Sequence, residues 1–330
     1  MRNLITDVVG VRVGNAHDER LASGVTVIVF DTPAVTSGLV SGGAPGGHDT
    51  TLLDPEYTVE QVNAVFLSGG SAFGLSAGSG VQAALREAGA GFAVGSVRVP
   101  IVTGAILFDL LNGGDKAWGR YAPYPGIAYE ATQAAAESFA LGSVGAGYGA
   151  TTATLKGGLG SASAVTSAGF TVGAVVAVNA IGMVTMGDSP HFWAAPYEVG
   201  QEFGGLGMAG PLASGALRMR LKGDQPATTI ACVVTDAVLT KAQAKRLAIM
   251  ANDGLAHAIR PVHAAFDGDT VFAAATGRKP LGSNPTRDLT EIGMVGADCL
   301  ARAVARGVYE AKALPFAKAL PSWKERYGLR

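Results

Sequence analysis

Two adjacent threonines stand at the start of a run of residues that predicts a buried strand. Thr228 and Thr229 follow a short polar segment and precede the apolar, β-branched run 230–234. Threonine is a common strand residue, so the pair by itself is ordinary. A threonine hydroxyl can also act as a nucleophile when a base takes its proton. If cleavage made Thr228 a chain terminus, its own α-amine could be that base.

Two carboxylates farther along the chain, Asp267 and Asp269, come just before another apolar run. Aspartates flanking a glycine are good turn formers, which is the purely structural interpretation. The chemical interpretation is that they orient a base near the nucleophile, because an activated hydroxyl needs both a base and groups that hold the base in place.

Lys156 and Asn179 are the other candidates for chemistry. Lys156 lies in a stretch between Glu137 and Asp188 that is almost free of charge. It is therefore either a solvated loop tip or a buried functional amine. Asn179 ends a predicted strand, where it could cap the following turn or present its amide to an oxyanion.

Composition predicts a large, well-packed core. The chain has 330 residues, of which 48% are hydrophobic and only 15% charged, and its formal net charge is −1. Such a low charge fraction favours a large core, a homo-oligomer, or both. A net charge near zero gives no indication of a nucleic-acid or anionic-membrane partner.

Neither the cysteines nor the histidines predict a cofactor or metal site. Cys232 and Cys299 lie in apolar surroundings typical of small core residues, and the five histidines lack ligand spacing. The N-terminus has no apolar signal segment. No apolar run reaches the roughly 18 residues of a membrane span. We therefore expect a cytoplasmic protein.

Hydrophobic periodicity predicts short strands, a few long helices and an irregular segment over 187–210. The expected strands are 8–13, 25–30, 62–68, 171–179 and 270–275. The expected helices are one ending at 88, 127–140, 240–259 with a capping box at its start, and one from 285 to before Pro315. The tail after Pro315 is expected on the surface, and sheets covered by helices are the arrangement that this order favours.

The glycine turn 69–75 connects a predicted strand to a predicted helix. Such a turn can cradle a phosphate. The dinucleotide fingerprint and a Walker lysine are both missing, so close packing of strand against helix is the favoured interpretation.

Several motifs follow one another along the chain. They are the glycine turn 69–75, Val-Pro-Ile-Val at 99–102 with Leu-Phe-Asp at 107–109, Val-Gly-Ala-Gly at 144–147, Lys-Gly-Gly at 156–158, Val-Asn at 178–179, Thr-Thr-Ile at 228–230 and Asp-Gly-Asp-Thr at 267–270. Taken together and in order, these motifs resemble the DmpA-type aminopeptidases, which include L-aminopeptidase/D-amidase-esterases, β-peptidyl aminopeptidases and the nylon-oligomer endohydrolase. The resemblance covers roughly residues 5 to 312.

The resemblance implies an α+β fold, a four-layer αββα sandwich similar to the N-terminal-nucleophile hydrolases and to the ornithine acetyltransferases. It also implies a single domain that cleaves itself between Ala227 and Thr228 into an α chain, 1–227, and a β chain, 228–330. By motif, Thr228 falls on the nucleophile and Asn179 on the oxyanion-stabilising residue. Lys156, Asp267 and Asp269 fall on the catalytic lysine and two aspartates of the nylon-oligomer hydrolase.

The implied function is hydrolysis of amide, and possibly ester, bonds in small peptides or amide oligomers. The expected assembly is a homo-oligomer, a tetramer of αβ units. An alanine before the nucleophile is also the junction of the ornithine acetyltransferase group, so acyl transfer is one alternative. An unprocessed, non-enzymatic relative is another.

Overall fold

The computed structural model describes residues 1–330 apart from 212–214, 216, 224 and 329–330. Its strands are β1 (Val11–Asp18), β2 (Ser23–Val40), β3 (Gly47–His48), β4 (Gln61–Ser68), β5 (Phe92–Val94), β6 (Val97–Val99), β7 (Val102–Ile106), β8 (Gly158–Val165), β9 (Thr171–Asn179), β10 (Thr228–Ala237) and β11 (Thr270–Lys279). Its α-helices are α1 (Ala77–Glu87), α2 (Tyr124–Gln133), α3 (Lys241–Ala258), α4 (Pro285–Tyr309) and α5 (Trp323–Tyr327). Its short 3₁₀ turns are η1 (Ile5–Asp7), η2 (Thr51–Leu53), η3 (Ser71–Ser76), η4 (Gly145–Gly147) and η5 (Ala195–Tyr197).

The long strand β2 connects two layers of sheet. Nine of the eleven described strands form one sheet in the order β3-β7-β4-β2-β11-β10-β9-β8, with β1 paired to β2, and β5 and β6 form a separate two-stranded sheet. The first half of β2 pairs with β4, and its last residues, from Val35 to Val40, pair with β11. A register shift between Val29 and Ala34 separates the two halves. The sheet therefore continues from one layer into the other through a single strand.

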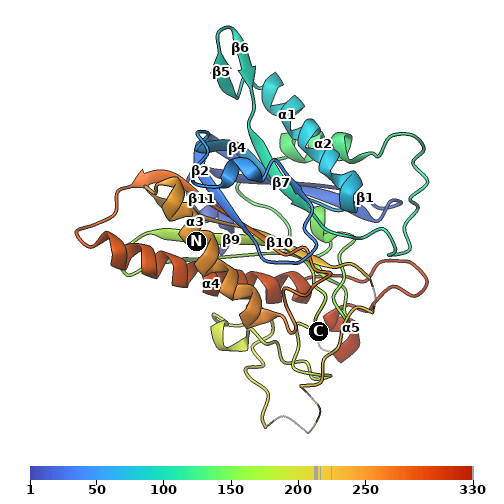
Figure 1. The fold of residues 1–330 in the computed structure, drawn as a ribbon. Coiled ribbons are helices and arrows are strands. Elements are labelled where there is room, and N and C mark those ends of the chain that lie inside the picture. Colours follow the sequence, from blue (N-terminus) through green and yellow to red (C-terminus); the bar gives the residue numbers. More distant parts are fainter. Residues whose placement is uncertain (212–214, 216, 224, 329–330) are drawn as a thin grey trace.

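Alternate side chains of the strands fill different layers of the core. On β10, Cys232 and Val234 belong to the same buried cluster as Leu67 of β4, between the two layers of sheet. Val233, pointing the other way, belongs to a cluster shared with Leu247 of α3. Figure 1 shows α1 and α2 on one side of the strands and α3 and α4 on the other. This arrangement confirms the predicted four-layer αββα sandwich.

Local signals place α3 and α4 correctly. The predicted capping box at Thr240 is present, since its side chain accepts the Gln243 N–H at 3.2 Å and its own N–H donates to Gln243 Oε1 at 2.8 Å. Asn284 caps α4, and Pro285 occupies the first turn of that helix. The helix ends at Tyr309, before Pro315, as predicted.

Tertiary contacts override the sequence pattern in two places. The expected helix 127–140 is shorter, because Ala136 leaves it to exchange two hydrogen bonds with Val13 of β1. The tail after Pro315 lies mostly on the surface, as expected, but α5 places Trp323 in the core at 1% exposure. The Trp323 ring stacks on that of Phe192, with centroids 5.5 Å apart.

Strand β8 is not predicted from the sequence, because its glycines weaken the strand pattern. The structure shows why a glycine is needed at position 160. A Cβ atom on Gly160 would lie 1.8 Å from the carbonyl oxygen of Ala303 on α4. Helix α4 therefore packs directly on the backbone of β8.

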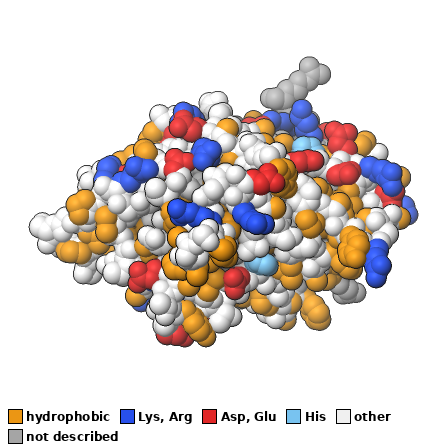
Figure 2. Space-filling model, turned by 90° about the horizontal axis from the view of Figure 1, so that it is seen from above, with side chains coloured by type: hydrophobic (Ala, Val, Ile, Leu, Met, Phe, Trp, Pro, Cys, Tyr) orange, Lys and Arg blue, Asp and Glu red, His pale blue; other side chains and the backbone are white. Residues whose placement is uncertain are grey.

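The surface carries charges of both signs. Figure 2 shows Lys and Arg side chains interspersed with Asp and Glu on the face seen there, with hydrophobic side chains between them. None of the helices that the structure describes has the length and apolar character needed to cross a membrane.

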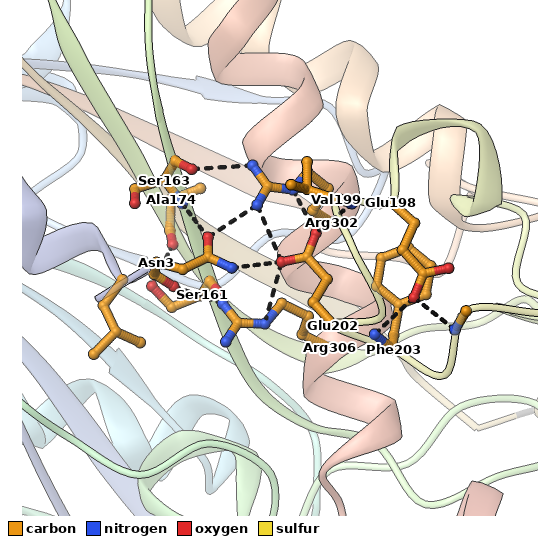
Figure 3. Close-up of polar contacts among 12 residues, drawn as sticks. Asn3, Ser161, Ser163, Ala174, Glu198, Val199, Glu202, Phe203, Arg302 and Arg306 are labelled. Carbon is orange, nitrogen blue, oxygen red and sulfur yellow. Dashed lines mark hydrogen bonds and ion pairs between the residues drawn. The ribbon is translucent and has the colours of Figure 1, made fainter. Parts of the chain in front are cut away.

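A buried ion-pair network ties α4 to two distant segments (Figure 3). The guanidinium of Arg302 donates to both carboxylate oxygens of Glu202, at 2.6 and 3.0 Å, and to the Ser163 carbonyl at 3.0 Å. Asn3 donates to the same carboxylate at 2.5 Å. Burial alone would raise the pKa of Glu202, but the hydrogen bonds from Arg302 and Asn3 outweigh it and the pKa is lowered. The pair is therefore ionised, and it joins the N-terminus, the irregular segment and α4.

We expect Arg302→Leu to lower the free energy of unfolding by about 3–5 kcal/mol, because the buried Glu202 would lose both hydrogen bonds from the guanidinium and keep only Arg306, 3.6 Å away, as a cationic partner. The matched control is Arg2→Leu, which breaks the exposed pair with Glu137, with side chains 48% and 64% exposed. That change should cost no more than about 1 kcal/mol. Urea unfolding measures both, and equal losses would contradict the assigned role of the buried pair.

Candidate functional site

The pairing of β9 with β10 sets two of the predicted site residues opposite each other. Asn179 is the last residue of β9, and its antiparallel partner is Thr228, the first residue of β10. Thr228 is 4% exposed and Asn179 is fully buried. Because β10 is also paired with β11 on its other edge, the start of this strand is held on both sides.

The peptide carbonyl before Thr228 accepts two hydrogen bonds. The Thr228 hydroxyl donates to the Ala227 carbonyl oxygen, and the Gly268 N–H donates to the same oxygen at 3.0 Å. The hydroxyl oxygen is thus next to the carbonyl group that it would attack. A donor on a carbonyl oxygen stabilises the negative charge that such an attack creates.

Gly268, the glycine between the two aspartates, has a steric role here. A Cβ atom at this position would lie 2.6 Å from the Thr228 hydroxyl oxygen and 3.0 Å from the Ala44 carbonyl oxygen. A glycine is therefore needed for the backbone N–H to approach the Ala227 carbonyl. The sequence indicates a turn at this place, but it does not indicate this contact.

Asp267 and Asp269 form a buried pair of carboxyl groups beside the Ala227–Thr228 peptide. Asp269 accepts the Thr229 N–H at 2.7 Å through one oxygen and, through the other, the backbone and ring N–H groups of His263 at 3.1 and 2.8 Å. Burial, followed by the negative charge of Asp269 and a hydrogen bond to it, raises the pKa of Asp267 to about 8. The pair therefore holds one proton near neutral pH.

Lys156 is a buried amine, which excludes the loop-tip interpretation. Its Nζ donates to the carbonyl oxygens of Gly147, Ala150 and Gly157 at 2.9, 2.8 and 2.8 Å. Burial, together with the charge of Lys222, lowers its pKa to about 7. The three acceptors favour the charged form, because only an ammonium has three N–H groups to donate. Among the described hydrogen bonds, none joins Lys156 to Thr228.

Lys222 is a site residue that the sequence does not reveal. Its Nζ donates to Asn179 Oδ1 at 2.6 Å and to the Thr151 carbonyl at 3.3 Å. The Thr151 N–H donates to the same Oδ1 at 3.0 Å, so the amide oxygen of Asn179 faces these two donors. Asn179 Nδ2 consequently faces the other way and donates to the Phe108 carbonyl at 2.9 Å. Burial lowers the pKa of Lys222 to about 7, against the opposing charges of Asp109 and Asp267.

A cavity of about 430 Å³ opens beside this cluster. It is lined by both amines and by polar groups, including Asp109, Asn112, Thr151, Lys156, Lys222 and Gln225. Apolar side chains such as Leu111 and Leu314 complete its wall. The cavity therefore offers room for a small ligand with both polar and apolar parts.

The glycine turn 69–75 holds a side chain of the protein itself. Asp109 accepts the Gly70 N–H at 2.8 Å and the Ser23 hydroxyl at 2.6 Å, and burial raises its pKa. A Cβ on Gly74 would lie 1.9 Å from the Gly69 carbonyl oxygen. Close packing is thus the reason for the glycines. The described residues include no group of three or more His, Cys, Asp or Glu that could hold a metal ion.

The structure brings four of the five predicted site residues, Thr228, Asn179, Asp267 and Asp269, to the start of β10. Lys156 instead lines the adjacent cavity, together with Lys222. The arrangement combines a hydroxyl in contact with a polarised carbonyl, a carboxyl pair that shares a proton, and two cationic groups. Nucleophilic attack on an acyl group needs a hydroxyl, a group that takes its proton and donors to the oxyanion, and these residues can supply such groups.

Comparison with known proteins identifies relatives along the whole chain. The family model for Peptidase family S58 matches residues 3–319. An uncharacterized aminopeptidase of Mycobacterium tuberculosis is 41% identical, with 98% of both chains covered. A 6-aminohexanoate-oligomer endohydrolase of Kocuria is 27% identical and covers 84% of this chain and 76% of its own.

A solved structure shares the fold. The L-aminopeptidase D-Ala-esterase/amidase of Ochrobactrum anthropi, described as a variant of the N-terminal-nucleophile hydrolase fold, superposes with a TM-score of 0.70 at 19% identity. The alignment covers 99% of this chain and 94% of the other. Neither acyl transfer nor a non-enzymatic role is favoured by these relatives. The chain belongs to peptidase family S58 and is a hydrolase of peptide or amide bonds built on the N-terminal-nucleophile fold.

Proposed function

We propose that the chain is a precursor that cleaves itself between Ala227 and Thr228, and that the freed Thr228 is then the nucleophile of an amide hydrolase. The main support for this proposal is that two groups donate hydrogen bonds to the carbonyl oxygen of Ala227. The Thr228 hydroxyl and the Gly268 N–H both donate to the Ala227 oxygen, so attacking group and oxyanion donor meet at the bond to be cleaved.

Self-cleavage proceeds through an ester. The Thr228 oxygen bonds to the Ala227 carbonyl carbon as its proton leaves, and the Gly268 N–H stabilises the resulting oxyanion. The carbon–nitrogen bond then breaks and the nitrogen takes up a proton, which leaves residue 227 esterified to the threonine oxygen. Water hydrolyses this ester, giving a carboxylate at Ala227 and a free hydroxyl and α-amine at Thr228.

In the cleaved enzyme, the α-amine of Thr228 is the general base, since its ordinary pKa of about 8 lies close to working pH. Asn179 stabilises the oxyanion formed on the substrate. Its Nδ2 has two hydrogens, of which one is donated to Phe108. Asp267 and Asp269 orient the amine, and Lys156 provides positive charge at the cavity wall.

The substrates we propose are small peptides or short amide oligomers. The M. tuberculosis relative is named an aminopeptidase and the Kocuria relative a 6-aminohexanoate-oligomer endohydrolase. The size and mixed lining of the cavity suit such molecules. We further propose that cleaved αβ units assemble into a homo-oligomer, and light scattering of the purified protein tests this assembly.

Replacing Thr228 by valine should leave one intact 330-residue chain with no hydrolase activity, because valine has the same shape but no hydroxyl. Thr229→Val is the matched control. Among the described residues, the buried hydroxyl of Thr229 has no hydrogen-bond partner, so this variant should split normally. Mass spectrometry of the denatured protein shows whether each variant is one intact chain or two fragments. Splitting of the Thr228 variant after residue 227 would disprove self-cleavage by this residue.

Asn179→Ala should reduce kcat of the split enzyme by roughly 100- to 1000-fold, the usual cost of losing an oxyanion donor. Lys222→Met should reduce it by about 10- to 100-fold, because a charged hydrogen bond that orients Asn179 is lost. Lys318→Met is the control, since Lys318 lines the same cavity but is exposed.

If Lys222 acts through Asn179, the double variant Asn179→Ala/Lys222→Met should be no slower than Asn179→Ala alone. Steady-state kinetics with an amino-acid p-nitroanilide provides the measurement. Fully additive losses would show that Lys222 acts independently of Asn179.

A further inference from the structure

His263 contacts Asp269 of the carboxyl pair through the oxygen that does not accept the Thr229 N–H. Its ring Nδ1 lies 2.8 Å from Asp269 Oδ2, and its backbone N–H donates to the same oxygen at 3.1 Å. The side chain is 21% exposed, whereas that of Asp269 is fully buried. The mechanism proposed above assigns no task to this histidine.

Asn252 of α3 contacts the other ring nitrogen of His263, Nε2. Asn252 Oδ1 accepts the Ser41 hydroxyl at 3.0 Å, and Asn252 Nδ2 lies 3.0 Å from His263 Nε2. The Asp269 carboxylate beside Nδ1 only accepts hydrogen bonds, so Nδ1 donates to it. An amide nitrogen only donates hydrogen bonds. Nε2 must therefore accept, and the one N–H of a neutral ring is on Nδ1, where it donates to Asp269.

The two carboxyl groups are consequently unequal. Asp269 accepts three N–H groups, from Thr229 and twice from His263. Asp267 accepts the Gly268 N–H at 3.1 Å. Hydrogen bonds donated to a carboxylate favour its ionised form, and two adjacent buried carboxyl groups do not both ionise readily. The negative charge is thereby placed on Asp269 and the proton on Asp267.

The position of this proton affects the scissile peptide through Gly268. The Gly268 N–H lies 3.0 Å from the Ala227 oxygen and 3.1 Å from Asp267 Oδ1, so it is shared between them. An ionised Asp267 would compete for this N–H and would repel the oxyanion forming on Ala227. A neutral Asp267 leaves the donor to the oxyanion.

We propose that His263, held by Asn252, is a positioning residue for self-cleavage. It fixes the negative charge on Asp269 and keeps Asp267 neutral, so that the Gly268 N–H is available to the Ala227 oxyanion. This role rests on the self-cleavage proposed above, and it extends that proposal to a residue with no contact to the reacting atoms.

The backbone at His263 allows a matched pair of variants. Its φ is +55°, a conformation that glycine adopts freely and that asparagine tolerates better than most other residues. His263→Asn retains a side-chain N–H close to the ring Nδ1 position. His263→Gly removes the side-chain donor without straining the backbone. A difference in splitting rate between the two variants therefore measures the effect of the side-chain hydrogen bond to Asp269.

The experiment follows splitting of freshly synthesised full-length precursor over time by mass spectrometry. His263→Gly should split about 10- to 100-fold more slowly than the wild type, the cost of one hydrogen bond to a charged group. His263→Asn should restore most of that rate. Equal rates for wild type and His263→Gly would overturn the positioning role while leaving self-cleavage standing.

A second measurement does not depend on cleavage. In Thr228→Val protein with ¹⁵N-labelled histidine, long-range NMR spectra should show His263 protonated at Nδ1 and bare at Nε2. A neutral ring protonated at Nε2 would overturn the proposal even if His263→Gly splits slowly. If the wild type never splits, the proposed function fails, and the ring spectrum still decides whether His263 donates to Asp269.

Discussion

The hydrogen bonding of the Ala227 carbonyl oxygen is the constraint on which the site depends. One donor, the Thr228 hydroxyl, comes from the start of β10, and the other, the Gly268 N–H, comes from the turn before β11. These strands are parallel neighbours in the middle of the sheet, and β10 is buried along its whole length. The geometry at the peptide is therefore as rigid as the core itself.

Charge near the site is balanced largely by the backbone. Lys156 is surrounded by three carbonyl oxygens, and Asp269 by two backbone N–H groups and one imidazole. Backbone dipoles supply this balance without adding further ionised groups to a chain in which only 15% of residues are charged. Each buried charge keeps a fixed position, because its partners belong to strands and tight turns.

Cleavage between Ala227 and Thr228 would break few of the contacts that hold the two parts of the chain together. Strand β10 would open the second chain but would remain paired with β9 of the first chain and β11 of its own. The Glu202–Arg302 pair also connects the two parts, since its members lie on opposite sides of residue 227. The new N-terminus at Thr228 would thus be held in the position that the precursor already gives it.

The sequence by itself determined the layered architecture, the cap of α3, the start of α4 and the residue types at the start of β10. Strand periodicity and capping are local, so they can be read without knowing the neighbours. The family motifs also pointed to Thr228, Asn179, Asp267 and Asp269, and the structure gathers these four residues. The roles given to them remain predictions.

Only the tertiary structure decided the surroundings of these residues. Lys222 meets Asn179, and His263 meets Asp269, through folding of loops whose sequences look like ordinary polar connections. The burial of Trp323 and the glycines of β8 likewise depend on packing partners far away in the chain. Hydrogen bonds and close contacts between distant segments have no local signature, because they depend on where the whole fold places each backbone.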